Sequence, residues 1–511
     1  MNIYLLFFIA LIPIVWLMVS LGVLKMPGHK TCTITLVITI ILATIVWKMP
    51  IGQALTATLE GAAMALWPII VVIIAAVFTY NLSIHTKSMD VIKDMMTGIT
   101  TDRRILVLIV AWGFGGFLEA IAGFGTAVAI PASILAALGF DPIFAAIICL
   151  IANTTPTAFG AIGLPVTTLA KVASINPVTL SYAVGIQLFA LIVVLPLVLV
   201  MLTGKSIKAI KGVVFISIAS GLSFAIPELL VAKYLGAELP ALIGSIICII
   251  VTVTIAKVFY KKTAAKDAVT VPVKKAFIAW IPFILILAFI LITSTLVPAI
   301  NKPLSAIKTS IQIYTGPHAK LSTFTWIANP GTLIILATFI GGLIQGAKSS
   351  EIVKVFMDTC KQMSKTAITI LAIVSLAKVM SYSGMITSIA VVLVAATGGF
   401  YPLFAPIIGA LGTFVTGSDT SANVLFGPLQ VEVARNLHMS PYWLAAANTG
   451  GATAGKMISP QSIAVATAAT GIVGAEGKIL KATLKFCLVY VLILGLIVYF
   501  GSKYLDRKSV V

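Results

Sequence analysis

Long, nearly uninterrupted apolar runs alternate with short polar stretches along the 511 residues of the chain. Examples are IYLLFFIALIPIVWLMVSLGVL near the beginning and LKFCLVYVLILGLIVYFG near the end. A helix of about 20 apolar residues is long enough to cross the hydrocarbon core of a bilayer. The pattern therefore predicts an all-α polytopic membrane protein with about 12–14 transmembrane helices. The clearest spans are expected near 3–23, 32–49, 62–82, 105–118, 178–202, 212–234, 239–258, 276–298, 331–346, 366–397, 402–416 and 480–501.

The composition excludes an ordinary soluble protein. Hydrophobic residues make up 60% of the chain and charged residues 10%, and the mean hydropathy is +1.14. Soluble proteins carry about 25% charged residues. The first apolar run has no basic leader and no convincing small-residue cleavage site, so we expect it to be retained as a span. The five cysteines include no CxxC pair, and we expect free thiols, no metal site and no cofactor.

The net charge of +19 predicts an orientation and not a nucleic-acid partner. The basic residues lie in short loops between spans, and such loops are cytoplasmic. The most basic loop, 259–275, separates an N-terminal half (1–258) from a C-terminal half (276–511). The same rule places the N-terminus outside, and the longest non-cytoplasmic loop would be 301–326. The other stretches expected in the cytoplasm are 26–30, 85–104, 203–211 and 348–365.

Two segments at membrane depth are too polar and too rich in glycine and proline to be simple spans. They are 113–171, which opens with GFGGFLEAIAGFGTAVAIP, and 409–470. Irregular backbone is tolerated within a membrane only where protein or a water-filled cavity satisfies its amides and carbonyls. We therefore expect both segments to be broken or re-entrant helices that line the inside of the protein.

The two segments resemble each other, and they cross in opposite senses. ANTTPTAFGAIGLP, which begins at Ala152, aligns without gaps with ANTGGATAGKMISP, which begins at Ala447, and matches it at five positions. The span before the first segment starts in the cytoplasm, whereas the span before the second starts outside. Paired discontinuous segments in an inverted repeat indicate the binding site of a secondary transporter.

Five acidic residues fall within apolar or broken segments, namely Glu60, Glu119, Glu228, Asp419 and Glu432. An ionisable group at the bilayer centre costs at least about 2.5–3.5 kcal/mol and is therefore a candidate functional group. Glu119 is either a proton carrier, because burial favours a neutral carboxyl group, or one half of a fixed ion pair or helix cap. Asp419, in GSDTSANVLFGPLQ, is either a helix N-cap or a proton or cation site.

Two lysines are candidate buried cations. Lys456, in GKMISPQS, could bind an anionic substrate or pair with a carboxylate. Lys378 lies within an apolar run and is either a second buried cation or a side chain that reaches the interface. The four histidines lie in or near expected loops, so we predict no histidine relay: His29, His85, His318 and His438.

Motifs of enzymes and ATP-driven pumps are missing from the sequence. It contains no GxxxxGK[ST], HExxH or GxSxG pattern. No polar stretch is long enough to form a soluble catalytic domain. We therefore expect a transporter with no catalytic residues.

Three motifs resemble signatures of the L-lactate permease family over essentially the whole chain. They are GFGGFLEAIAGFGTAVAIP, GSDTSANVLFGPLQ and NTGGATAGKMISPQSIAVA. Members of that family are proton-coupled symporters of short 2-hydroxy monocarboxylates, including L-lactate and glycolate, in the bacterial cytoplasmic (inner) membrane. The family is similar to a wider group of ion transporters with inverted repeats and re-entrant hairpins. The chain departs from the family pattern in AIAGFG, from Ala120, and in FGPLQ, which leaves its substrate preference open.

The resemblance implies import of lactate or glycolate with protons, coupled by Glu119 or Asp419. The substrate carboxylate is expected at the positive ends of half-helices. The candidate substrate-binding residues are Gly123, Gly125, Thr126, Asn153, Thr154, Ser418, Thr420, Ser421, Asn423, Asn448, Thr449, Lys456, Ser459 and Gln461.

Two alternatives remain open at this point. Sodium could replace the proton as coupling ion, since Asp419 is surrounded by hydroxyl oxygens. A membrane sensor or assembly subunit is disfavoured, because a scaffold needs no costly buried acid. The sequence leaves open whether the chain forms a homo-oligomer.

Overall fold

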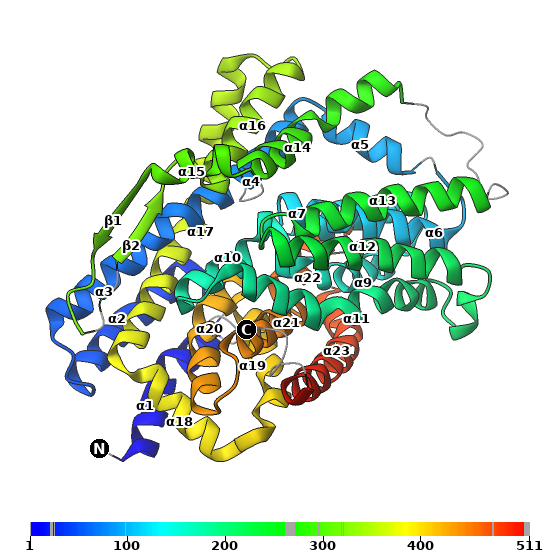
Figure 1. Ribbon diagram of the computed structural model, residues 1–511. Helices are drawn as coiled ribbons and strands as arrows, with labels where there is room; N and C mark the ends of the chain where they lie inside the picture. Colours follow the sequence, from blue (N-terminus) through cyan, green and yellow to red (C-terminus); the bar gives the residue numbers. More distant parts are fainter. Residues whose placement is uncertain are drawn as a thin grey trace.

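The computed structural model describes residues 2–20, 24, 26–97, 99–123, 125–260, 271–293, 297–317, 319, 321–472 and 475–504. Most of these residues are helical (Figure 1). The elements of the first half are α1 (Ile3–Met18), α2 (Gly28–Ile45), α3 (Ile51–Met64), η2 (Ala65–Ile70), α4 (Val71–His85), α5 (Ser88–Thr97), α6 (Arg103–Val107), η3 (Leu108–Phe114), α7 (Gly115–Ile121), α8 (Thr126–Ala137), α9 (Pro142–Ala152), η4 (Thr155–Phe159), α10 (Gly160–Ala173), α11 (Pro177–Thr203), η5 (Ile207–Ile210), α12 (Val214–Tyr234) and α13 (Pro240–Phe259).

The second half adds a short two-stranded sheet to a further set of helices. Its elements are α14 (Val273–Thr293), α15 (Pro298–Ala306), β1 (Lys308–Gln312), β2 (Leu321–Thr325), α16 (Pro330–Ile344), α17 (Ser349–Ser383), α18 (Met385–Thr397), η7 (Gly398–Phe400), α19 (Tyr401–Thr416), α20 (Asp419–Asn436), α21 (Pro441–Lys456), α22 (Pro460–Thr470) and α23 (Glu476–Tyr504). Residues 261–270 of the expected basic loop lie outside the described residues.

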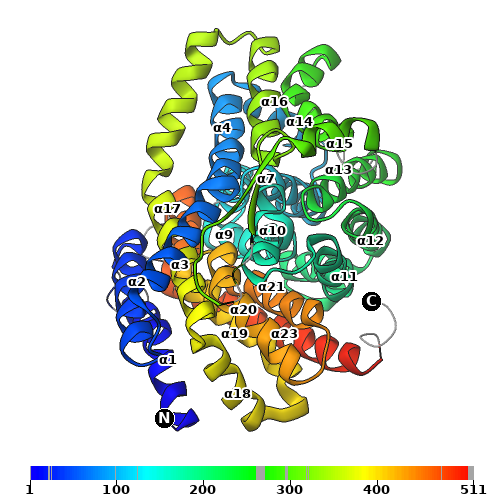
Figure 2. The same ribbon diagram turned by 60° about the vertical axis from the view of Figure 1, so that its left-hand side comes forward.

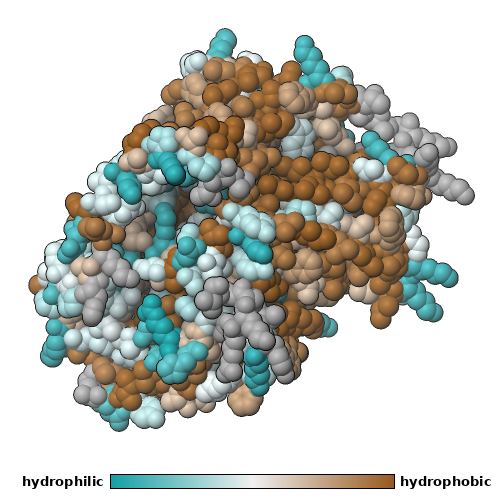
Figure 3. Space-filling model, in the orientation of Figure 1, coloured by the Kyte–Doolittle hydropathy of each residue, from teal (hydrophilic) through white to brown (hydrophobic). Residues whose placement is uncertain are grey.

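The predicted class, an all-α polytopic membrane protein, is confirmed. Among the described residues ten helices are long and apolar enough to cross a membrane, or up to eleven if the bent pair of α9 and α10 is one span. This is fewer than expected, because α1 has only 16 residues and α16 only 15, and because α18 and α19 together form one candidate span. Figure 3 shows hydrophobic residues spread broadly over the surface formed by α12 and α13, as a lipid-facing surface requires.

Two expected boundaries around α17 are wrong. The basic stretch 348–365, expected as a cytoplasmic loop, is helical and forms the first half of α17. The expected span 366–397 is two helices, because Gly384 has a φ of +90° and separates α17 from α18. A left-handed residue cannot continue a right-handed helix, and glycine adopts this conformation without a steric penalty. The expected loop 85–104 likewise contains α5.

The stretch 301–326 is not simply a loop, since it contains the end of α15 and an antiparallel hairpin. Lys308 of β1 pairs with Thr325 of β2, and the register continues to Gln312 opposite Leu321. The hairpin is tied to the helices beneath it. The indole nitrogen of Trp67 donates to the carbonyl oxygen of Thr325 over 2.7 Å.

The two broken segments repeat the same order of elements. The helices α7, α8, α9 and α10 correspond in order to α19, α20, α21 and α22. Gly125 (φ +90°) and Gly417 (φ +74°) mark the first breaks, and Pro142 and Pro441 begin the third helices. After the breaks, α8 packs against α22 and α10 packs against α20. Figures 1 and 2 show α10 and α20 near the middle of the molecule. Each broken segment thus packs its second helix against the fourth helix of the other, as a two-fold relation between the two segments requires. Their opposite orientation in the membrane stays a prediction.

Glycines allow α19 and α21 to pack backbone against backbone. A Cβ atom at Gly409 would collide with the carbonyl oxygen of Asn448, and one at Gly451 would collide with that of Pro406. Membrane helices gain stability mainly from such close packing, since lipid is as apolar as their side chains. The close approach holds the second broken segment in position.

We expect Gly451→Ala to destabilise the protein by about 3 kcal/mol, the upper end of the usual range for overpacking, because a backbone carbonyl cannot rotate away. Thermal unfolding in detergent measures the loss. The matched control is Gly477→Ala in α23, where an added Cβ would meet no atom within 4 Å. Equal melting temperatures of the two variants would contradict the close packing.

Candidate substrate-binding site

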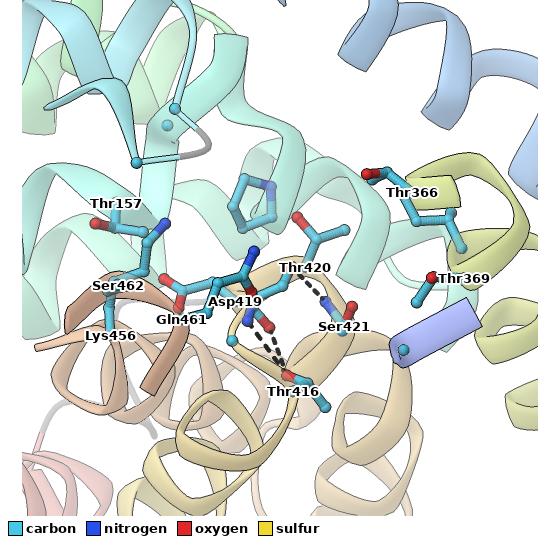
Figure 4. Close-up of a pocket in the computed structure, with 18 of the residues that line it drawn as sticks. Thr157, Thr366, Thr369, Thr416, Asp419, Thr420, Ser421, Lys456, Gln461 and Ser462 are labelled. Atoms are coloured by element: carbon cyan, nitrogen blue, oxygen red, sulfur yellow. Dashed lines mark hydrogen bonds between the residues drawn. The ribbon is translucent and has the colours of Figure 1, made fainter. Parts of the chain in front are cut away.

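A cavity of about 790 Å³ lies between the two broken segments and is bordered by α17. Nine of the residues predicted from the sequence line it: Glu119, Gly123, Gly125, Ser418, Asp419, Thr420, Ser421, Lys456 and Gln461. In Figure 4, Asp419, Lys456 and Gln461 lie close together on one side, and Thr366 and Thr369 of α17 lie across the cavity. The structure thus brings together residues that are up to 342 positions apart, from Glu119 to Gln461.

Helix N-termini converge on this cavity. Gly125 precedes α8, Ser418 and Asp419 begin α20, and Pro460 and Gln461 begin α22; all five residues line the cavity. The free amides and the dipole of a helix N-terminus favour a negatively charged group. Ser418 uses its hydroxyl to cap the backbone amide of Ser421 over 3.3 Å, so part of this potential is satisfied internally. The arrangement is suited to a small anion.

Three buried ionisable side chains form the charged centre of the cavity. The ammonium group of Lys456 donates to Oε1 of Glu119 over 3.5 Å, and Asp419 interacts electrostatically with both residues. Relative exposure is only 2% for Glu119, 2% for Asp419 and 8% for Lys456. Asp419 accepts a hydrogen bond from the hydroxyl of Thr413 over 3.1 Å. Among the described residues, Oε2 of Glu119 and Oδ2 of Asp419 have no hydrogen-bond partner.

Two glycines leave the space that this charged centre needs. A Cβ atom at Gly160 would lie 2.6 Å from Oε1 of Glu119. At Gly417 a Cβ would collide with the side-chain oxygen of Gln461, and the φ of +74° also favours glycine. Both glycines belong to the motifs from which the site was predicted.

Seven predicted binding residues do not line the cavity. Asn423, Asn448 and Thr449 bond to one another, because Oδ1 of Asn423 accepts from the amide of Asn448 (2.9 Å) and from the hydroxyl of Thr449 (3.1 Å). The amide of Asn423 also reaches the carbonyl oxygen of Pro165 over 3.2 Å and so joins α20 to α10. Asn448 and Thr449 thus hold Asn423 in place within the second broken segment, and Asn423 in turn bonds to the first.

The remaining four of these residues lie beside the breaks. The hydroxyl of Thr126 closes the turn at Gly123 over 2.8 Å. Thr154 bonds the carbonyl oxygen of Ile151, and Ser459 accepts from the amide of Ser462 over 3.3 Å. Asn153 is buried, and neither polar atom of its side chain has a partner among the described residues. They shape the site without lining it.

Sequence reasoning missed several polar residues of the cavity. Thr157 and Ser462 stand within the predicted motifs and could have been included. Thr366 and Thr369 gave no signal, because their segment was divided between a loop and a span although it lies inside α17. His29 also lines the cavity, where no role for a histidine was expected.

The other buried charges have different surroundings. Lys378 pairs with Glu60 at 3.0 Å, and the hydroxyl of Tyr382 donates to the same carboxylate, so this pair joins α3 to α17 away from the cavity. Glu228 of α12 is fully buried, and neither carboxylate oxygen has a partner in the described part of the chain. Glu432 pairs with the exposed Arg435 at 3.4 Å and is not deeply buried.

Comparison with known proteins identifies close relatives. A family description for L-lactate permease matches residues 6–504. An L-lactate permease from Streptococcus iniae is 58% identical over 439 residues, which cover 86% of this chain and 93% of that protein. The glycolate permease GlcA of Escherichia coli K12 is 37% identical over 531 residues, and the two coverages are 96% and 94%.

A solved structure shares the fold. It is that of MtrF from Neisseria gonorrhoeae, described as illuminating a class of antimetabolite efflux pumps. The TM-score is 0.52 at 12% sequence identity, over 95% of this chain and 97% of that chain. At this identity the likeness concerns the fold alone, which is that of a membrane transporter.

We expect Lys456→Met to destabilise the protein by about 3–5 kcal/mol, because it leaves two buried carboxylates without their cation. Adding Glu119→Gln should recover most of this loss. Melting temperatures in detergent of the two single variants and the double variant measure the coupling. Lys361→Met, on the exposed side of α17, is the control. Additive effects of the two substitutions would show that the Lys456–Glu119 pair is not energetically coupled.

Proposed function

Because the chain belongs to the L-lactate permease family, we propose that it imports L-lactate, glycolate and related short 2-hydroxy monocarboxylates together with protons. The protein is a multi-pass transporter of the bacterial inner membrane and not an enzyme. The names of its relatives support the substrate class. Coupling to protons is supported by the three buried charges at the centre of the cavity.

The proposed binding mode places the substrate carboxylate at the N-termini of α8, α20 and α22. Preorganised amides and the ammonium of Lys456 stabilise such an anion. Hydroxyl groups from three elements line the same space and can bond the 2-hydroxyl group: Thr157, Thr420 and Thr369. A cavity of about 790 Å³ is much larger than lactate, so the remainder holds water while the cavity is open.

The proposal of proton coupling depends on one observation, the charge balance within the cavity. With both acids ionised, Glu119, Asp419 and Lys456 together have a net charge of −1, which opposes a second anion in a cavity of low dielectric constant. One proton makes the centre neutral, and the substrate carboxylate then meets no net repulsion. Binding of the anion and of the proton therefore favour each other.

We assign the proton to Asp419. Glu119 has a direct cationic partner, because the ammonium group of Lys456 lies 3.5 Å from its Oε1. Asp419 has no cation within 4 Å among the described residues, and its hydrogen-bonded neighbour is the neutral hydroxyl of Thr413. A proton on Asp419 relieves its repulsion with Glu119 and leaves the ion pair intact.

The first test is uptake of labelled L-lactate by proteoliposomes under an inward proton gradient. Accumulation that collapses on addition of a protonophore is the expected result. A sodium gradient at clamped pH provides the second arm, because accumulation there and not under a proton gradient would establish sodium coupling. Glycolate is tested in the same way. Failure of every short carboxylate to enter would overturn the proposal.

We expect Asp419→Asn to keep lactate exchange between the two sides but to reduce gradient-driven accumulation at least tenfold, since the amide cannot carry a proton. Asp141→Asn is the matched control, because Asp141 caps α9 by accepting from the amide of Phe144 over 2.8 Å and asparagine caps equally well. Full accumulation in Asp419→Asn would refute the assignment of the proton to this residue.

A further inference from the structure

A second cavity, of about 430 Å³, runs along α10 next to the main cavity. We call it the outer cavity. The residues that line it include Ile162, Leu164, Thr168, Lys171, Glu238 and Asn329. Leu164 lines both cavities, and the neighbouring residues Ala161 and Ile162 line one each. A wall of only a few residues therefore separates them.

The two cavities face opposite ends of the transmembrane helices. The main cavity is lined by His29, in the basic stretch 26–30 that the positive-inside rule places in the cytoplasm, and by the exposed Lys365 in the basic first half of α17. The outer cavity is lined by Ile175, before α11, and by Glu238, between α12 and α13. Both turns lie at the end of these helices opposite to the basic stretch 203–211.

The wall between the cavities is held in an unusual backbone conformation. Ala161, Ile162 and Gly163 all have positive φ values, of 44°, 57° and 71°. Such values cost residues other than glycine about 1–3 kcal/mol each and persist only where the surroundings impose them. A Cβ at Gly163 would collide with the carbonyl oxygen of Ala237, so the turn before α13 is part of those surroundings.

The outer cavity also carries groups that suit a carboxylate. No carboxylate of the described residues approaches the ammonium of Lys171 within 4 Å, although Glu238 acts on it electrostatically. Thr168 lines the same cavity, is 1% exposed, and its hydroxyl has no partner among the described residues. A buried hydroxyl left without a partner costs free energy that a ligand or water can recover.

We propose that the outer cavity is the entry site for the substrate, where Lys171 attracts a small monocarboxylate before it passes the wall formed by 161–164. This inference rests on the proposed function. Lys171 acts by raising the local concentration of the anion, and Glu238 opposes it. Electrostatic attraction of this kind changes the rate of capture more than the maximal rate.

The test compares two substitutions of opposite charge effect, using initial lactate influx into proteoliposomes at low salt. Lys171→Met should raise the KM about fivefold, and Glu238→Gln should lower it about twofold, while the maximal rate changes less than twofold. Both effects should shrink in about 0.5 M salt, where exposed charges are screened. Lys302→Met, an exposed lysine of α15 that does not line the outer cavity, is the control.

If the two residues had a merely structural role, both variants would show a higher KM. That result, or unchanged KM values in both, would overturn the proposed entry site. If the unsubstituted protein transports lactate in that experiment, the proposed function stands and only the entry site fails. If it transports no short carboxylate, the proposed function itself fails.

Sidedness gives an independent measurement. Thr167→Cys, in a chain whose partly exposed Cys360 is replaced by serine, should react with a membrane-impermeant thiol reagent from the non-cytoplasmic side. Lactate should slow this reaction several-fold. Reaction from the cytoplasmic side alone would overturn the proposal.

Discussion

The structure depends on one constraint, which is that two carboxyl groups and an ammonium group must be buried at membrane depth. An isolated ionised group there is costly, so the charges must share one site and be met by backbone dipoles. Glu119 and Lys456 pair within the main cavity, and Asp419 stands beside them. The helix breaks bring N-termini to the same place. Irregular backbone and buried charge, each unfavourable in lipid, therefore stabilise each other.

Neither half of the chain can build this site alone. The first broken segment supplies Glu119, and the second supplies Asp419 and Lys456. The half-helices also exchange partners, since α8 packs on α22 and α10 on α20. Asn423 reinforces this contact by bonding the carbonyl oxygen of Pro165. The proposed binding residues therefore lie where the two broken segments meet.

The surrounding helices have their own polar connections. Glu60, Lys378 and Tyr382 join α3 to α17, and the ring of Tyr382 stacks on that of Tyr314 with centroids 3.8 Å apart. The hairpin that carries Tyr314 thus bears on a long helix that also borders the main cavity through Thr366 and Thr369. Buried pairs of this kind contribute little net stability but define which helices may be neighbours. The Glu60–Lys378 pair is therefore a structural pair, distinct from the charges of Glu119, Asp419 and Lys456 that are proposed to bind substrate and proton.

The sequence by itself determined the membrane class and the two broken segments, and it singled out Glu119, Asp419 and Lys456 as candidate functional residues. These are local properties, because apolar length, glycine and proline act on the backbone where they stand, and a charge within an apolar run is conspicuous. Only the tertiary structure decided that Glu119 meets Lys456, 337 positions away, and that Lys378 instead meets Glu60. It also decided that Asn423, Asn448 and Thr449 bond to one another and do not line the cavity. The physical reason is that an amide or hydroxyl group has the same chemistry whether its partner is protein or ligand, and helix packing alone selects the partner.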